Sequence, residues 1–250
     1  MGGLAEREEF HMKPAGSASS TIVRLVPRPY PAPFSKTEQR IVEAAIRTGL
    51  QRILAAKKLN PKTIVEKKLN QALVDELSRM LDESPAPVRG FRSTIFETVS
   101  RGQEMVNYNG KELEKRPDIV FRRCGPAPKG IERQHHALFV ECKIVDSTRT
   151  MSYYCLQGVD RFRCGQYAWS VSLGMMVGYV RDNYHLPDTL RDYLLNPEFG
   201  WRHRIEAGPD LRDPPPSPGV WVTRHHRRWK YVEGAAPGSI TLHHIWLPIP

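Results

Sequence analysis

Long apolar runs are missing from this sequence of 250 residues. The run nearest the middle of the chain, GMMVGYV at 174–180, is far shorter than the roughly 20 residues that a membrane-spanning helix needs. The first residues, MGGLAEREEF, lack the apolar centre of a signal peptide. We therefore expect a protein without membrane contact.

Cysteine is also scarce, with 4 residues that form no C-x-x-C pair. Cysteines at such scattered positions indicate neither a disulfide framework nor a zinc knuckle. The simplest expected location for a chain of this kind is the reducing cytoplasm.

Acidic residues are outnumbered by basic ones. Lys and Arg total 37 against 27 Asp and Glu, which gives a formal net charge of +10 and a pI near 9.6. An excess of positive charge raises the affinity for polyanions and speeds their capture. Nucleic acid is therefore the first partner to consider, although the same charge can serve solubility alone.

The remaining composition is that of a folded globular protein, with 40% hydrophobic and 26% charged residues. Residues 1–34 are rich in Gly, Ser, Ala and Pro and end in RPYPAPF, which predicts a disordered tail and a Pro-rich linker. The rest of the chain, 35–250, is long enough to form a single domain with its own core.

Two amphipathic helices are predicted at the start of this domain. Ser35 and Glu38 form an S-x-x-E capping box ahead of apolar residues at helical spacing. Asn60 as N-cap and Pro61 at the first helical position predict a second helix, which continues to about residue 82.

The rest of the domain alternates between strand-like and helix-like segments. Runs of β-branched and aromatic residues predict strands, and helical spacing predicts two further helices. The expected strands are 90–99, 118–121, 137–145, 174–180, 220–223 and 239–247, and the expected helices are 152–163 and 166–172. This order indicates a mixed α/β fold.

Two of the expected strands carry charged residues. Alternate side chains of a strand face the same way, so Glu141 and Lys143 in LFVECKIV point together, while Cys142 faces the packing layer on the other side. If the strand at Asp118 pairs with this one, the Asp118 and Glu141 carboxylates lie together, and they repel each other unless a cation lies between them. A Mg²⁺ ion suits such a pair of acids. Lys143 could then hold or deprotonate a water that attacks a phosphodiester.

The dipeptide PD ending at Asp118, followed by ECK at 141–143, resembles the PD-(D/E)xK signature of the restriction-endonuclease-like nuclease superfamily. The resemblance covers roughly residues 60–180. It implies an α/β fold with a central mixed sheet flanked by helices, in the order α-β-β-β-α-β, to which this chain would add an N-terminal helix and C-terminal strands. It also implies a metal-dependent nuclease that uses Mg²⁺, or Mn²⁺ as a substitute. We expect DNA rather than RNA as the substrate.

The motif is short, so an accidental match is the alternative. The dipeptide PD occurs three times, and an acid two residues before a lysine occurs twice. Only the combination of Asp118 with Glu141 has PD first and both parts in strand-like segments. The loop that joins these strands is a further place to expect substrate contacts, and its basic residues are Arg122, Arg123, Lys129 and Arg133.

Many members of this superfamily complete the metal site with a Glu from the preceding helix. Glu66 lies at the edge of the apolar face of the second helix and matches this placement best. The resemblance therefore implies Asp118, Glu141 and Glu66 as metal ligands. Glu76 on the same helix is the competing candidate, and either acid could instead be an ordinary surface carboxylate.

Family members also often carry a polar helper after the third core strand. Gln157 and Arg161 stand there, one helical turn apart. RecB-like nucleases have Q-x-x-x-Y at this place, whereas the fourth residue after Gln157 is Arg161. Gln157 is retained as a catalytic candidate, with a plain structural role as the alternative, and Arg161 is expected to contact phosphate.

The segment LQGVDRFRCGQYAWSVSLGMMVGYV is similar to a pattern in restriction-endonuclease-like proteins of bacteria, some of which serve in anti-phage defence. This resemblance implies defence against foreign DNA as the setting, with a homodimer or a protein of the same defence system as a further partner. The rival function is a catalytically silent subunit that uses the same fold to bind nucleic acid or protein.

A basic and aromatic cluster, RHHRRWKY at 224–231, lies near the end of the chain. It combines side chains that bind phosphate with side chains that stack on bases, and a solvated hairpin is the other interpretation. The HH pairs at 225–226 and 243–244 predict no zinc site, because neighbouring residues of a strand point to opposite faces. The predicted nucleic-acid contacts are Arg224, Arg227, Arg228 and Lys230.

Overall fold

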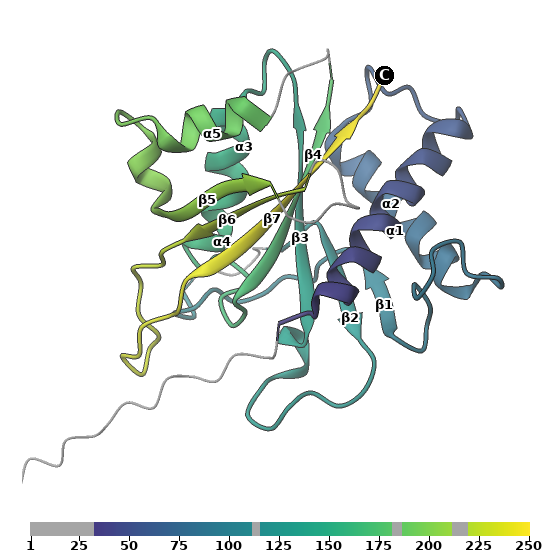
Figure 1. The fold of residues 1–250 in the computed structure, drawn as a ribbon. Helices are drawn as coiled ribbons and strands as arrows, with labels where there is room; N and C mark the ends of the chain where they lie inside the picture. Colours follow the sequence, from purple (N-terminus) through teal and green to yellow (C-terminus); the bar gives the residue numbers. More distant parts are fainter. Residues whose placement is uncertain (1–32, 112–115, 182–186, 212–219) are drawn as a thin grey trace, which may run out of the picture.

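The computed structural model describes residues 33–111, 116–181, 187–211 and 220–250. These residues form an α/β fold with one open seven-stranded sheet and helices on both of its faces (Figure 1). The expected α/β class is therefore confirmed. The predicted disordered tail lies, apart from its last two residues, outside the described residues.

The sheet is mixed and has the strand order β1-β2-β3-β4-β7-β6-β5. β3, β4 and β7 run parallel to one another, while β1 and β2 on one side and β6 and β5 on the other are added antiparallel. The strands are Phe96–Ser100 (β1), Ile119–Arg123 (β2), Ala137–Val145 (β3), Leu173–Val180 (β4), Ile205–Leu211 (β5), Val220–His225 (β6) and Ile240–Pro248 (β7).

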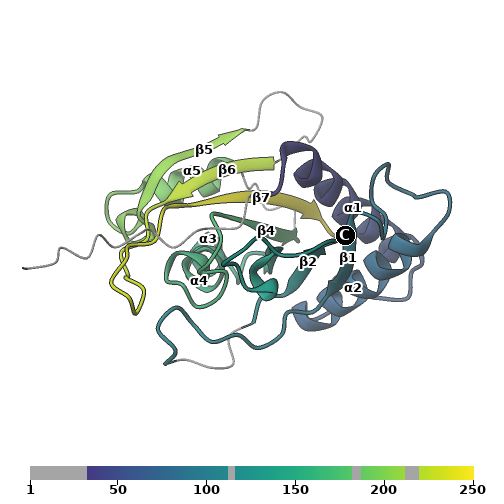
Figure 2. The same cartoon turned by 90° about the horizontal axis from the view of Figure 1, so that it is seen from below.

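The helices lie in two groups, which Figures 1 and 2 show on either side of the central strands. The first group is α1 and α2, and the second contains α3 to α5 with a π-helical turn, η2, that joins α3 to α4. The helices are Lys36–Ala55 (α1), Glu66–Asp82 (α2), Met151–Tyr154 (α3), Cys155–Val159 (η2), Asp160–Arg163 (α4) and Pro187–Leu195 (α5), and two short 3-10 turns are Arg133–His135 (η1) and Gly200–His203 (η3).

The central strand β3 contributes side chains to both core layers, as its alternating pattern predicts. Val140, Cys142 and Ile144 belong to the apolar layer under α1 and α2. Phe139 and Val145 belong to the layer under the second group of helices. Glu141 and Lys143 therefore lie between apolar residues on this second face.

The first predicted helix is confirmed, including its cap. Ser35 Oγ accepts a hydrogen bond from the Glu38 backbone N–H at 3.2 Å, and Glu38 Oε2 accepts one from the Ser35 N–H at 2.6 Å. The start of the second helix is wrong by several residues, because Asn60 closes a separate turn in which its carbonyl accepts from the Ile64 N–H at 2.9 Å. The chain is extended at Val65 (φ −79°, ψ 147°), so α2 begins only at Glu66.

Two other expectations are corrected. The strand expected at 90–99 is confined to β1, because residues before it form turns in which the Phe96 N–H donates to the Arg92 carbonyl at 3.1 Å. The helix expected at 166–172 does not form, because the left-handed backbone at Gly165 (φ 70°) and Ala168 (φ 52°) interrupts it. The other expected strands and the helix at 152–163 are confirmed within a few residues, whereas α5 and β5 were not anticipated.

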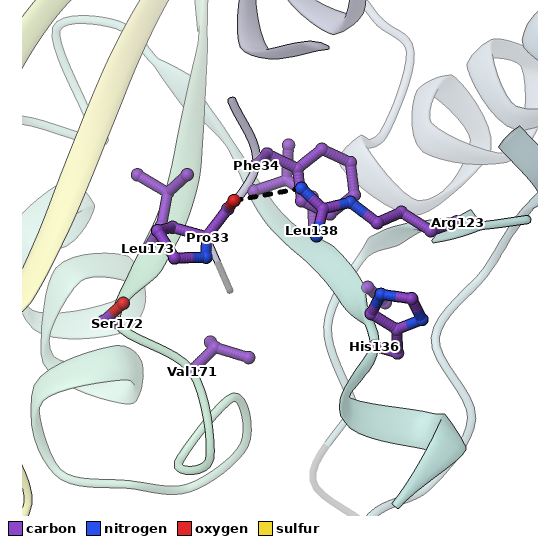
Figure 3. A pocket seen from close by; sticks show the side chains of 9 residues that line it. Pro33, Phe34, Arg123, His136, Leu138, Val171, Ser172 and Leu173 are labelled. Carbon is purple, nitrogen blue, oxygen red and sulfur yellow. Dashed lines mark hydrogen bonds between the residues drawn. The ribbon is translucent and has the colours of Figure 1, made fainter. Parts of the chain in front are cut away.

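Arg123 fixes the point where the described chain enters the fold (Figure 3). Its guanidinium donates to the Pro33 carbonyl at 3.0 Å and to both carboxylate oxygens of Glu38, at 3.0 and 2.8 Å, and it lies 4.1 Å from the centre of the Phe34 ring. The cavity beside it has a volume of only about 10 Å³, which is room for one water at most. This cavity is a packing gap rather than a ligand site.

Within the described ranges, no helix is both long and apolar enough to cross a bilayer.

Candidate functional site: three carboxylates around Lys143

The site forms where β3 extends beyond its neighbour β2. The antiparallel pairing places Ile119, the first residue of β2, opposite Val140, so the next N–H groups on that edge of β3 need other acceptors. Asp118 Oδ2 accepts from the Cys142 N–H at 3.0 Å, and Glu66 Oε2 accepts from the Ile144 N–H at 3.1 Å. Two acids thus continue the hydrogen bonding of the sheet edge.

The ammonium group of Lys143 lies among three carboxylates. Its Nζ is 2.6 Å from Glu141 Oε1, 3.1 Å from Glu66 Oε1 and 3.7 Å from Asp118 Oδ2. It also donates to the Cys142 carbonyl at 2.9 Å. The expected convergence of Asp118, Glu141 and Lys143 is therefore present, and Glu66 joins it.

Glu141 lies at the bottom of the site, with a fully buried side chain. Arg161 Nη1 is 3.0 Å from its Oε1, and the Tyr167 hydroxyl donates to its Oε2 at 2.5 Å. Burial and the nearby negative charge of Asp118 raise the pKa of Glu141 to about 7, although Lys143 and Arg161 act in the opposite direction. Part of the Glu141 population is therefore protonated near neutral pH.

The pKa of Lys143 also changes in this environment, in the direction expected of a cation among acids. Burial lowers its pKa, but the charges of Glu141, Glu66 and Asp118 outweigh burial and raise the pKa of Lys143 above its usual value. The ammonium is therefore charged at neutral pH.

The rim of the site is accessible, in contrast to its bottom. The side chains of Glu66, Asp118 and Arg161 are 24%, 15% and 32% exposed. Arg101 is 25% exposed and donates to Asp118 Oδ1 at 3.1 Å. Three carboxylates consequently face three cations, Lys143, Arg161 and Arg101, and a substrate could reach the site from the rim.

The structure decides between the two acids of α2. Glu76 does not belong to the site, because its buried carboxylate is paired with Arg52 at 3.3 Å and with Arg79. Glu66 reaches Lys143 because it is the first residue of α2, next to the free edge of β3. The alternative of an ordinary surface carboxylate is thus excluded for both.

Gln157 and Arg161 differ in their placement, although both lie on the helical segment after β3. Arg161 reaches Glu141, whereas the Gln157 side chain is exposed and takes no part in the ion pairs of the site. The π-helical turn places Gly158 against the sheet, where an added Cβ would lie 2.3 Å from Met176 Cε. Glycine at this position lets the segment approach β3 and β4 closely.

Sequence reasoning missed two residues of the site, Tyr167 and Arg101. Tyr167 follows the helical segment, in a stretch expected to be helical, and no spacing rule connects it to Glu141. Arg101 directly follows β1, and its contact with Asp118 depends on the pairing of β1 with β2. Neither residue leaves a local signal in the sequence.

The basic segment at 224–231 is only partly a surface. Arg227 is 1% exposed, and its guanidinium donates to the carbonyls of Gly238 at 2.6 Å and Trp169 at 3.3 Å. The prediction that Arg227 contacts nucleic acid is therefore wrong, because its guanidinium is used inside the protein. Arg224 is exposed but paired with Glu206 at 3.1 Å, while Arg228 and Lys230 are exposed.

The loop between β2 and β3 also differs from expectation. The loop leaves β2 at Arg123 and enters β3 at Ala137. Arg123 lies five residues along the strand from Asp118, which corresponds to about 17 Å of extended strand. Arg123 forms an ion pair with Glu38, and Arg133 forms one with Glu97 at 2.9 Å. This loop therefore lies at the end of the hairpin away from Lys143, and substrate contacts from it are not supported.

The histidines near the C-terminus join a hydrogen-bonded network rather than a metal site. Thr223 Oγ1 lies 2.8 Å from His225 Nε2 and 2.7 Å from His244 Nε2. Throughout the part of the chain that the structure describes, no group of three or more His, Cys, Asp or Glu side chains is arranged to hold a metal ion as it stands. At the candidate site, the position between the acids is taken by the Lys143 ammonium.

Comparisons with protein-family models, with curated proteins and with solved structures gave no match.

Proposed function

We propose that the protein is a metal-dependent nuclease of the PD-(D/E)xK type, and that α2, β1 to β3, the helical segment from α3 to α4, and β4 correspond to the restriction-endonuclease-like core. The single observation that supports this most is the convergence of Asp118, Glu141 and Glu66 on Lys143 Nζ, within 3.7 Å. Three acids around one point at an accessible sheet edge are costly for folding and are typical of functional sites.

The donor set suits a hard divalent cation. Carboxylate oxygens are the ligands that Mg²⁺ prefers, and Mn²⁺ accepts the same oxygens. Asp118, Glu141 and Glu66 would hold the ion, which would compete with Lys143 for their oxygens. A bound Mg²⁺ would supply charge stabilisation at the phosphoryl oxygens.

The protein's own side chains would carry out the remaining steps. Lys143 would hold the attacking water, whose oxygen forms a bond to phosphorus while one ester P–O bond breaks. The attacking water would give up one proton to bulk water, and the leaving oxygen would take up one proton from bulk water. Arg161, at the rim, would bind a phosphate oxygen through guanidinium N–H groups that Glu141 does not use. Tyr167 would keep Glu141 in place. DNA is the favoured substrate, and defence against foreign DNA in the cytoplasm is the proposed setting.

Cleavage of plasmid and oligonucleotide DNA, with RNA in parallel, tests the proposal. We expect activity with Mg²⁺ or Mn²⁺, loss of activity in EDTA, and a reduction of at least about a hundredfold in Lys143→Ala. Because Lys143→Ala leaves buried acids without their cation, Glu66→Gln at the rim serves as a second variant, and thermal unfolding shows whether each variant is folded. Equal cleavage by wild type and both folded variants would contradict the assignment.

One observation favours a second function, a catalytically silent subunit that binds nucleic acid or protein. Each carboxylate of the site is already paired with Lys143, Arg161 or Arg101, so the charges balance without a metal ion. Binding of nucleic acid without cleavage under all metals, by the protein alone and with partners from a defence system, would identify this function.

A further inference from the structure

A second surface with nucleic-acid chemistry lies at the opposite edge of the sheet from β1 and β2. It is a pocket of about 540 Å³ between the end of α5, η3, the start of β5 and the segment that follows β6. Its walls include Trp201, Arg204, Glu206, His226 and Arg228. The pocket shares no residue with the carboxylate site.

Trp201 gives the pocket an exposed aromatic face. The side chain is 55% exposed, and its indole N–H donates to the Glu198 carbonyl at 3.0 Å, which fixes the orientation of the ring. The guanidinium groups of Arg202 and Arg204 lie 5.7 and 5.4 Å from the ring centre. An oriented indole beside guanidinium groups is suited to stacking with a nucleobase next to a phosphate.

The charge around the pocket is positive. Glu206 is the acid in its lining, and its carboxylate is already bound to Arg224, His226 and Ser239. Within the described residues, no ion pair joins Arg204 or Arg228 to a carboxylate. Both guanidinium groups are therefore available to a phosphate.

The backbone of Arg204 adopts an unusual conformation for a residue with a side chain. Its φ of 51° lies in the left-handed region, which glycine adopts far more easily than a residue with a side chain. Arg204 is the C-cap of η3, a position where a left-handed backbone is common, so a glycine at this position would suit the backbone.

We propose that this pocket binds single-stranded nucleic acid, with an unpaired base stacked on Trp201 and the neighbouring phosphates held by Arg204 and Arg228. One contact inside the protein connects the element that carries Trp201 with the helix that carries Arg161. Asp160, next to Arg161 on α4, is 3.0 Å from His203 Nδ1, and His203 belongs to η3 together with Trp201. The inference concerns binding alone, so it can fail separately from the proposed cleavage.

Fluorescence anisotropy with a labelled 12-nucleotide single strand, measured in EDTA so that no cleavage occurs, tests the inference. Trp201→Leu removes the stacking surface from an exposed position and is expected to weaken binding by about tenfold or more. Arg204→Gly suits the left-handed backbone, so the fold is kept while one phosphate contact is lost. For this variant we expect weaker binding and a salt dependence that is less steep by about 0.7 in log K against log salt.

Arg89→Gln is the matched control, because Arg89 is exposed and lies outside the pocket. Its substitution removes one positive charge, as Arg204→Gly does. We expect its binding to stay within about twofold of wild type, and we expect a duplex of the same sequence to bind less tightly than the single strand. Unchanged binding by Trp201→Leu, or an equal loss in Arg89→Gln and Arg204→Gly, would overturn the inference. Displacement of the strand by an equal nucleotide concentration of AMP would also overturn it and would identify a mononucleotide pocket instead.

Discussion

Glu66 and Glu76 occupy the same helix, ten residues apart, and have different environments. Glu66 binds Lys143 and the Ile144 N–H, while Glu76 is held between Arg52 and Arg79 near the end of α1. The first contact belongs to the candidate site, and the second joins α1 to α2. The chemical type of the residue is the same, so only its neighbours determine its role.

This difference predicts opposite effects of the same substitution. Glu66→Gln should abolish nuclease activity with little change in the free energy of unfolding, because Glu66 is at the exposed rim. Glu76→Gln should keep the activity and reduce the free energy of unfolding by about 1–2 kcal/mol, since it removes a charged hydrogen-bond partner of Arg52. Cleavage assays and urea unfolding of both variants give the comparison, and loss of activity in a folded Glu76→Gln would contradict it.

The start of α2 is the element that most directly positions the candidate site. The turn closed by Asn60 and the extended residue Val65 delay the helix until Glu66. If the helix had begun at Pro61, Glu66 would lie in its second turn rather than at its first residue. An acid in the first turn is also favoured by the helix dipole.

The same helix end lacks a side-chain cap, which allows a test. Val65 is the N-cap residue and is 55% exposed. Its side chain has no atom that could accept a hydrogen bond from the first turn of the helix. Val65→Ser should supply an acceptor for a first-turn N–H group and raise the free energy of unfolding by about 1 kcal/mol. Val65→Ala is the control for the loss of the valine side chain. Equal stability of the two variants in urea unfolding would mean that those N–H groups already have partners.

A buried chain of hydrogen bonds joins distant parts of the domain and runs from α3 through β7 and β6 to η3. Tyr154 OH lies 2.9 Å from His244 Nδ1, Thr223 Oγ1 lies between His244 and His225, and His225 Nδ1 lies 2.7 Å from the His203 carbonyl. The Thr223 hydroxyl has one proton and donates to only one of the two rings. Neutral histidines with all donors in the same direction satisfy every member of this chain.

Burial lowers the pKa of His225 to about 4 and lowers the pKa of His244 well below its usual value. At these two histidines, the unfolded chain therefore binds more protons than the folded one below about pH 6.5. The stability that these histidines contribute is complete above that pH and is lost as the pH falls towards 4. Glu141, with its raised pKa, changes in the opposite direction over the same range.

A comparison with His225→Gln isolates the histidine contribution. Between pH 7.5 and 5.0, wild type should lose about 2 kcal/mol more free energy of unfolding than the variant does, because the variant has no imidazole to protonate at this position. Urea unfolding at both pH values measures the difference. The same loss in both proteins would show that His225 does not remain neutral in the fold.

The sequence by itself determined the local features of this protein. The capping box of α1, the alternation of Glu141 and Lys143 with the apolar residues of β3, and the α/β class follow from short-range rules, because caps and side-chain periods depend on neighbouring residues. The pairing of β2, which directly follows Asp118, with β3, which carries Glu141, could also be predicted, since the two strands follow each other in the chain.

Only the tertiary structure decided which distant residues complete each arrangement. The start of α2, the contacts of Tyr167 and Arg101 with the acids, and the burial of Arg227 all depend on how elements far apart in the chain pack together. The physical reason is that burial and pairing of charges are set by the neighbours that the whole fold provides, and no local pattern records those neighbours.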